Sequence, residues 1–127
     1  MHVWGNGVWL DELVYLCRKR NIFLIEDASE SIGTKYVSGK YKGSHTGKIG
    51  RLGCFSFNGN KIITSGGGGM IITNEKKLAD KAYYLTTQAK DDRLRYIHNS
   101  IGYNFRLSNL HAAIGLAQLE QLPNFLK

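Results

Sequence analysis

Apolar and polar positions in the first part of the chain follow the period of an amphipathic helix. The i, i+3, i+4, i+7 spacing is met by Leu10, Leu13, Val14 and Cys17. Acidic residues occupy the first turn of this pattern and basic residues the last, so it predicts a helix over residues 8–20. The short apolar run over residues 21–26 is typical of a buried strand in an α/β layer.

Two further strands and a second helix are predicted after a glycine-rich stretch. Residues 52–57 and 70–73 are short apolar runs beside glycines, as expected for strands. Asn74 is placed to cap a helix over residues 75–85, whose apolar stripe includes Leu78. The chain therefore alternates between helix and strand periods, which is typical of an α/β fold.

The remaining segments are connections, a last helix and the start of the chain. Residues 33–51 are rich in glycine and predict a loop or an exposed hairpin, while residues 86–107 show no clear period. Ser108 is placed as the N-cap of a last helix, which Pro123 is expected to end. Residues 1–4 look like the end of a strand. A complete α/β domain would hold more strands, so we expect a piece of a longer protein.

Composition bounds the class of protein. The 127 residues suffice for one domain, and 43% hydrophobic with 21% charged residues indicates a soluble, folded chain. No apolar run approaches a membrane span and the first residues do not resemble a secretory signal, so we expect a cytoplasmic protein without a membrane partner. The two cysteines, expected to be reduced and buried, and the four histidines have no metal-ligand spacing, which predicts no metal site.

The formal charge of +7 favours anionic partners and raises one alternative function. A basic module that binds nucleic acid would need a contiguous cationic face. The lysines and arginines are instead scattered along the chain, which argues against nucleic acid as a partner.

Two residues stand where α/β proteins place ligand-binding groups. Asp27 follows an apolar strand, and the carboxyl ends of parallel strands border the ligand crevice. The alternative is that Asp27 caps the following turn together with Ser29. Lys61 lies between the strand at 52–57 and a run of four glycines, although a single loop lysine is usually solvated.

The joint pattern of four segments is more specific than either residue alone. Together they strongly resemble the DegT/StrS-type family of sugar aminotransferases, which are fold type I enzymes that use pyridoxal 5′-phosphate. The segments are IEDASES at 25–31, FSFNGNK at 55–61, SGGGGM at 65–70 and GYNFR at 102–106. The sequence of these segments resembles most closely the branch that aminates UDP-4-keto-6-deoxy amino sugars on routes to bacillosamine or legionaminic acid.

The resemblance implies a fold and a reaction. Residues 1–127 would be part of the large, cofactor-binding domain, a mostly parallel sheet flanked by helices, without the N-terminal segment and the C-terminal small domain. The family transfers an amino group, for which glutamate is the expected donor, to the 4-keto carbon of a nucleotide-linked 6-deoxy sugar. The alternatives are a non-catalytic relative or fragment, and a fragment that alone has little or no activity.

By resemblance, Lys61 is the lysine that forms the Schiff base with pyridoxal phosphate and later moves a proton. Asp27 is then the carboxylate that keeps the pyridine nitrogen protonated, which the electron-withdrawing role of the ring requires. Ser56 occupies the position of a hydroxyl that donates to the cofactor phosphate. Without the resemblance, Ser56 would be read as a strand-end serine bonded to backbone.

Three further positions are carried over from the family. Asn58 stands near the cofactor or substrate, where many relatives have histidine. Glu30 stands where many relatives have a glutamine beside the cofactor ring, although it could equally be helix-start charge. Asn104 matches an asparagine that reaches the cofactor phosphate of a neighbouring subunit, which implies a homodimer; the alternative is a turn residue.

The glycine run and Arg51 each depart from a familiar pattern. The glycine run precedes a strand and lacks the Gly-Lys-Ser/Thr ending of a P-loop, so we do not expect it to bind a nucleoside triphosphate. Arg51 stands where relatives commonly have aspartate, which reverses a charge beside the second strand.

Overall fold

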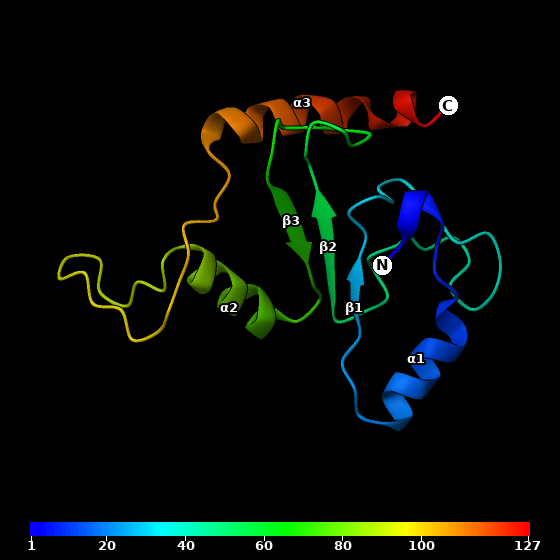
Figure 1. Ribbon diagram of the computed structural model, residues 1–127, viewed down its shortest axis with the longest axis horizontal. Helices are drawn as coiled ribbons and strands as arrows, with labels where there is room; N and C mark the ends of the chain where they lie inside the picture. The colour runs from blue at the N-terminus through cyan, green and yellow to red at the C-terminus, as the bar shows by residue number, and fades with distance from the viewer.

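The computed structural model describes residues 1–127 as a three-stranded sheet with three α-helices and one 3₁₀ turn (Figure 1). In chain order the elements are η1 (Val3–Gly5), α1 (Leu10–Lys19), β1 (Ile25–Asp27), β2 (Leu52–Ser56), β3 (Gly69–Ile72), α2 (Lys76–Thr86) and α3 (Asn109–Phe125). The α/β class is confirmed. No helix combines the length and the apolar character that crossing a membrane requires.

The sheet has the order β1-β2-β3 and is mixed. β1 and β2 are parallel, with Asp27 paired to Cys54, whereas β2 and β3 are antiparallel, with Ser56 paired to Gly69. The antiparallel pair follows from the connection over residues 57–68, which returns the chain at the same end of the sheet. A parallel arrangement would need a crossover to the opposite end.

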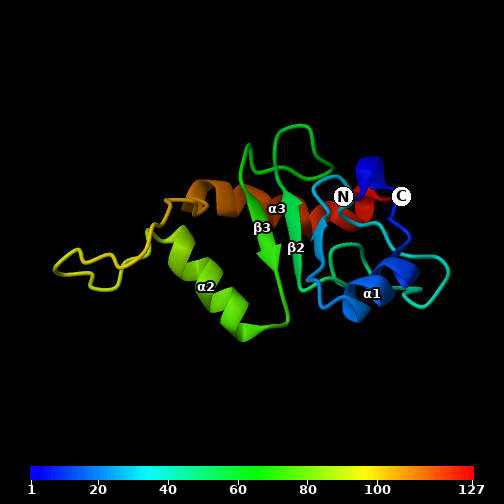
Figure 2. The ribbon, with the colours of Figure 1, turned by 60° about the horizontal axis from the view of Figure 1, so that its bottom comes forward.

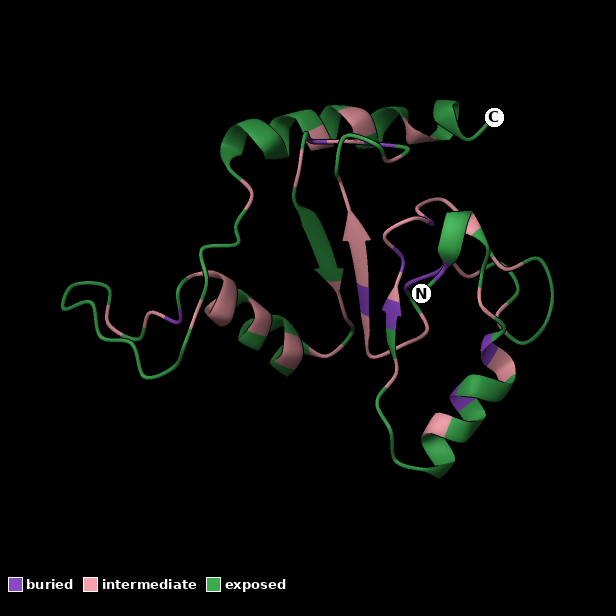
Figure 3. Ribbon diagram, in the orientation of Figure 1, coloured by how far each residue is buried: buried purple, intermediate pink, exposed green.

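The helices lie on different sides of this sheet. In both ribbon views α2 lies beside β3 and α1 beside β1, while α3 runs across the end of the sheet where β1 and β2 finish (Figures 1 and 2). Leu10 and Val14 are the buried residues of α1. Most buried positions gather around β1, the start of α1 and the first residues of the chain (Figure 3).

The start of the chain and the first strand differ from the predictions. Residues 1–4 form no strand, because Val3–Gly5 turns as a 3₁₀ helix, although the His2 amide donates to Asp27 O at 2.9 Å. The predicted strand over 21–26 is reduced to Ile25–Asp27. Phe23 and Ile25 are exposed rather than buried, and Phe23 lies outside the shortened strand.

One of the two predicted helix N-caps is confirmed. The other N-cap, the predicted helix end at Pro123 and the predicted burial of the cysteines differ from the structure. The Ser108 cap is confirmed, since its Oγ accepts the His111 amide at 3.3 Å. The Asn74 cap is wrong: Glu75 is the N-cap residue, and its amide donates to the Thr73 hydroxyl. Pro123 does not end α3, which continues to Phe125 because the loss of one amide donor leaves the Leu126-to-Leu122 bond intact. The two cysteines are free and half-buried rather than buried.

Candidate active site

The candidate site lies at the carboxyl ends of β1 and β2. Because these strands are parallel, Asp27 at the end of β1 and Ser56 at the end of β2 reach the same edge of the sheet (Figure 1). The connection that follows β2 carries Lys61 back over this edge. The topology thus brings together three residues that lie far apart in the sequence.

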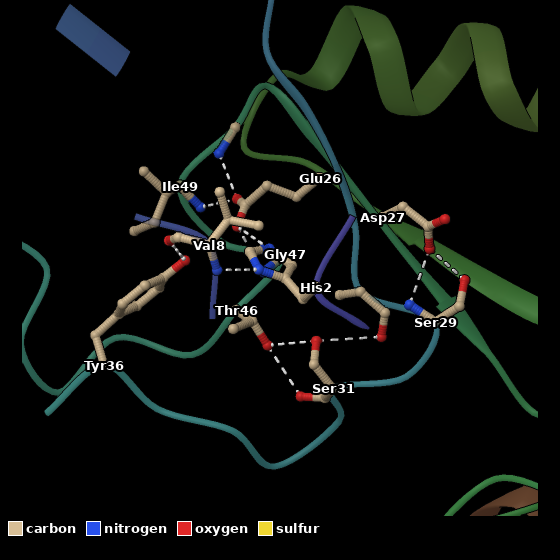
Figure 4. Close-up of polar contacts among 12 residues, drawn as sticks. His2, Val8, Glu26, Asp27, Ser29, Ser31, Tyr36, Thr46, Gly47 and Ile49 are labelled. Carbon is tan, nitrogen blue, oxygen red and sulfur yellow. Dashed lines mark hydrogen bonds and ion pairs between the residues drawn. The ribbon is translucent and has the colours of Figure 1, made fainter. Parts of the chain in front are cut away.

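Asp27 uses one carboxylate oxygen within the chain. Its Oδ1 accepts the Ser29 amide at 3.0 Å and the Ser29 hydroxyl at 2.5 Å (Figure 4). These bonds, followed by the positive charges of the N-terminal amine and Lys61, hold the pKa of Asp27 below its ordinary value. The turn-capping alternative is therefore real, but it occupies only Oδ1, and Oδ2 has no hydrogen-bond partner in the chain.

Lys61 faces an acidic neighbour. Its Nζ lies 3.9 Å from Glu30 Oε1, and the Lys61 side chain is only 14% exposed. The other Glu30 oxygen, Oε2, accepts the Trp4 amide at 2.9 Å. Lys61 is thus not a solvated loop lysine, and its amine makes no hydrogen bond within the chain.

The connection after β2 is a tight loop that places Lys61. The Lys61 amide donates to Asn58 O at 3.1 Å, and the Ser65 amide donates to Phe57 O at 3.0 Å. The Ser56 hydroxyl accepts only a long bond, 3.4 Å, from the Asn58 amide, so its own proton remains available. Asn58 itself is exposed at the tip of this edge.

The glycine run closes the same loop. Gly68 has φ +81°, a conformation that favours glycine, and a Cβ at Gly69 would overlap the backbone oxygen of Phe55. The run therefore allows close packing of the loop onto β2 and the return into β3.

Asn104 lies apart from these residues. It lies on the connection between α2 and α3, where it forms an isolated β-bridge with Thr87. Asn104 is exposed and no hydrogen bond joins it to the cluster of Asp27, Glu30 and Lys61. Within one chain, Lys61 lies near Glu30 and Asp27, whereas no hydrogen bond or ion pair joins the Asn104 side chain to these residues.

An apolar pocket lies away from these residues. A mainly apolar groove of about 970 Å³ lies between β3 and α2, and its lining includes Met70, Ile72 and Tyr83 but neither Asp27 nor Lys61. No group of three or more His, Cys, Asp and Glu side chains is arranged to hold a metal ion.

Sequence reasoning missed the buried pair of His2 and Glu26 below the site. Glu26 Oε2 lies 2.9 Å from His2 Nε2, and both side chains are almost fully buried. The available signal was a carboxylate one residue before Asp27, inside an apolar run. In a strand, neighbouring side chains point to opposite faces, so one of the two acidic residues had to face the interior.

The fold of the chain matches that of solved aminotransferase structures. Helicobacter pylori PseC, an aminotransferase involved in the biosynthesis of pseudoaminic acid, superimposes with a TM-score of 0.85 at 30% identity. That match covers 97% of this chain and 32% of the PseC chain. AHBA synthase, for 3-amino-5-hydroxybenzoic acid, also gives a TM-score of 0.85, at 28% identity, over 97% of this chain and 32% of its own.

The chain belongs to the DegT/DnrJ/EryC1/StrS aminotransferase family, which matches it over residues 1–127. It is 47% identical to the putative pyridoxal phosphate-dependent aminotransferase EpsN of Bacillus subtilis, over 96% of this chain and 30% of EpsN. It is 44% identical to the GDP-perosamine synthase of Escherichia coli O157:H7, over 99% of this chain and 33% of that enzyme. The chain thus spans about a third of the length of these relatives.

Proposed function

We propose that the protein containing this chain is a pyridoxal phosphate-dependent aminotransferase that aminates the 4-keto carbon of a nucleotide-linked 6-deoxy sugar, with glutamate as donor. Residues 1–127 would be part of its cofactor-binding large domain. The single observation that carries the proposal is the convergence of Lys61 with Asp27 and Glu30 at one edge of the sheet in a chain of this family.

The free polar atoms at this edge fit the proposed cofactor. Asp27 is an ionised carboxylate whose Oδ2 is unpartnered, which suits a protonated pyridine nitrogen. The Lys61 amine is partly buried and makes no hydrogen bond, which suits a residue that must react with an aldehyde. The Ser56 hydroxyl retains its proton for donation to a phosphate.

Each residue then has a defined task. When bound, pyridoxal phosphate would supply two things: an aldehyde carbon that receives the amino group, and a ring that withdraws electrons. Asp27 would hold a proton on the ring nitrogen of this cofactor, and Ser56 with Asn58 would bind and orient the cofactor at the end of β2. Lys61 Nζ would take up and release the proton that moves at the reacting carbon, and Glu30 lies beside that amine, with Oε1 3.9 Å from Nζ.

Cofactor binding is tested by adding pyridoxal phosphate to the purified protein, reducing with borohydride and mapping the modified lysine by mass spectrometry. We expect a new visible absorbance band and modification of Lys61 alone. Lys61→Ala should abolish both. Lys76→Ala is the matched control, because Lys76 is a surface lysine paired with Asp80, and it should leave both unchanged. Labelling spread over many lysines would contradict the proposal.

The substrate is tested separately. The sequence resemblance favours a UDP-linked 4-keto-6-deoxy amino sugar, and one relative is named UDP-4-amino-4,6-dideoxy-N-acetyl-β-L-altrosamine transaminase, at 37% identity. The GDP-perosamine synthases are more similar, at up to 44%. UDP- and GDP-linked 4-keto-6-deoxy sugars should therefore be compared, each with glutamate and with aspartate. If neither sugar is turned over, the proposed reaction is refuted.

We propose that Asn104 acts on the cofactor phosphate of a second subunit in a homodimer. Its exposure supports this role, because an exposed side chain can reach a second subunit. The test mixes two inactive variants, Lys61→Ala and Asn104→Ala, and allows their subunits to exchange. If Asn104 acts across the interface, mixed dimers regain one intact site and part of the activity. Failure to recover activity despite subunit exchange would place Asn104 in its own subunit's site.

A further inference from the structure

The buried carboxylate of Glu26 lies directly behind the candidate site. Glu26 and Asp27 are consecutive residues of β1, so their side chains leave opposite faces of the strand (Figure 4). Asp27 points to the edge that carries Lys61. Glu26 points into the interior, where it is 2% exposed and its partner His2 is 1% exposed.

The Glu26 carboxylate is surrounded by hydrogen-bond donors. Oε2 accepts from the Gly47 amide at 2.9 Å and faces His2 Nε2 at the same distance. Oε1 accepts from the Ile49 and Gly50 amides, each at 2.6 Å. An ionised carboxylate is the one side chain of this shape that offers acceptors alone. A glutamine would direct its amide hydrogens against two of these donors.

The geometry also determines the tautomer of His2. The Val8 amide can only donate, and it lies 3.0 Å from His2 Nδ1 (Figure 4). Nδ1 must therefore accept, so the ring proton resides on Nε2 and is donated to Glu26. His2 is thereby held at both ring nitrogens.

This network holds the main chain of Asp27. The His2 amide donates to Asp27 O at 2.9 Å, so the residue that binds the Glu26 carboxylate also binds the next residue's carbonyl. On the other side, the turn over residues 47–50 lies against both strands. A Cβ at Gly50 would come within 2.7 Å of Leu24 O, and one at Gly53 would overlap Gly47 O.

We propose that Glu26 is a positioning residue, which holds Asp27 in place through His2 and the 47–50 turn and so sets the direction of its free oxygen. The inference deepens the proposed function, since the orientation of Asp27 matters because of the cofactor nitrogen that it would hold. Glu26 touches neither cofactor nor substrate and acts through Asp27 alone.

The first test is a double-mutant cycle on the dissociation constant for pyridoxal phosphate. Glu26→Gln should weaken binding at least about tenfold in the otherwise unchanged protein, because small displacements of a binding group are costly. In an Asp27→Ala background the same change should alter the constant by less than about twofold. Equal effects in both backgrounds would overturn the proposal, since a purely structural role does not depend on Asp27. Glu12→Gln, at an exposed site on α1, is the matched control.

The second test needs no cofactor and separates this proposal from the proposed function. The carboxyl carbon shift of Asp27 is followed against pH by NMR in the cofactor-free protein. Glu26→Gln should move the Asp27 titration toward that of an ordinary aspartate, because the hydrogen bonds from Ser29 loosen when Asp27 shifts. An unchanged titration would overturn the positioning role even if pyridoxal phosphate binds. Conversely, a shifted titration in a protein that does not bind the cofactor would uphold the positioning role and reject the proposed function.

A variant that fails to fold would not end the test. His2→Leu fills similar space and leaves the three amide bonds to Glu26, so it replaces Glu26→Gln in both measurements with the same expected direction. In the unaltered protein, ¹⁵N spectra of His2 should show a protonated Nε2 and an unprotonated Nδ1. A proton on Nδ1 would contradict the network from which the proposal is built.

Discussion

At the scale of single residues, Asp27 combines a structural and a proposed chemical role. Its Oδ1 closes the turn with Ser29, and its Oδ2 stays free at the edge of the sheet. The same bonds that close the turn keep the carboxyl group ionised, since they hold its pKa down. One serine therefore affects local stability and the charge available to a ligand.

Replacement of Ser29 by alanine should reveal this coupling. We expect a loss of about 1 kcal/mol in the free energy of unfolding at neutral pH, because one charge-assisted hydrogen bond disappears. The native pKa of Asp27 is lowered, so its contribution is present above the unfolded-state pKa and is lost as the pH falls through the native one. The difference between variant and wild type should accordingly shrink below pH of about 4.

Urea unfolding at a series of pH values measures the difference in the free energy of unfolding between Ser29→Ala and the wild type. Ser38→Ala is the control, because Ser38 is exposed and its hydroxyl makes no hydrogen bond. A difference that stays constant down to acid pH would show that Ser29 does not act through the Asp27 carboxylate.

At the scale of elements, the glycine run determines how the loop after β2 returns to the sheet. Gly69 lies opposite Ser56, and its lack of a side chain permits the backbone contact with Phe55 O. Gly67, two residues earlier, faces open space: no atom lies within 4 Å of the place that a Cβ would take, and its φ is not positive. Two glycines of one run thus have different requirements.

Gly69→Ala should destabilise the protein by about 2 kcal/mol, because the backbone must move to accept the methyl group. Gly67→Ala, the matched control, should be neutral or slightly stabilising. Thermal unfolding followed by circular dichroism distinguishes the two. Equal melting temperatures for both variants would show that the close approach of β3 to β2 does not constrain this position.

Arg51 and Glu75 join the start of β2 to the start of α2. The guanidinium of Arg51 pairs with the Glu75 carboxylate through two bonds and lies 3.9 Å from the centre of the Phe23 ring. The pairing lowers the pKa of Glu75. The charge reversal at Arg51 noted in the sequence therefore has a local partner.

Glu75→Gln should lower the melting temperature slightly, and the difference from wild type should shrink at high salt, because ions screen an exposed pair. Lowering the pH through the depressed pKa of Glu75 should remove the difference as well. A difference that is independent of salt and pH would assign the effect to packing on Phe23 instead.

At the scale of the whole molecule, this chain exposes more surface than a closed domain. Its accessible area is 9206 Å², against about 6,800 Å² expected for a folded monomer of 14.2 kDa. α3 is apolar on several sides, and its Leu110 and Leu116 are mostly exposed. Such a surface favours association.

The 127-residue chain expressed by itself should therefore self-associate. Light scattering coupled to size-exclusion chromatography should give a mass that rises with concentration. Changing Leu110 and Ile114 to lysine should reduce this self-association, because both residues lie on one face of α3. Leu94→Lys, at an exposed position outside the helices, is the control and should reduce it less. A monomeric mass at all concentrations would contradict the prediction.

Much of this molecule could be predicted from local patterns. The period of the apolar residues identifies α1, α2 and α3, and short apolar runs identify β2 and β3, because these signals depend only on neighbouring residues. The resemblance singled out Lys61 and Asp27, and in the structure Lys61 lies beside Glu30 and its charge helps to lower the pKa of Asp27. Helix ends were less predictable: Pro123 was expected to end the last helix, but α3 continues past it to Phe125.

What the sequence by itself determined was the α/β class, the order of the elements and the residues worth testing, since these follow from periodicity and from recognisable segments. Only the tertiary structure decided what each polar group contacts. The four donors around Glu26 come from His2 and from the 47–50 turn, each more than 20 residues away in the sequence. Arg51 pairs with Glu75, which is also more than 20 residues away in the sequence. Hydrogen bonds are short and directional, so such partners depend on how distant segments pack and leave no periodic signal in the chain.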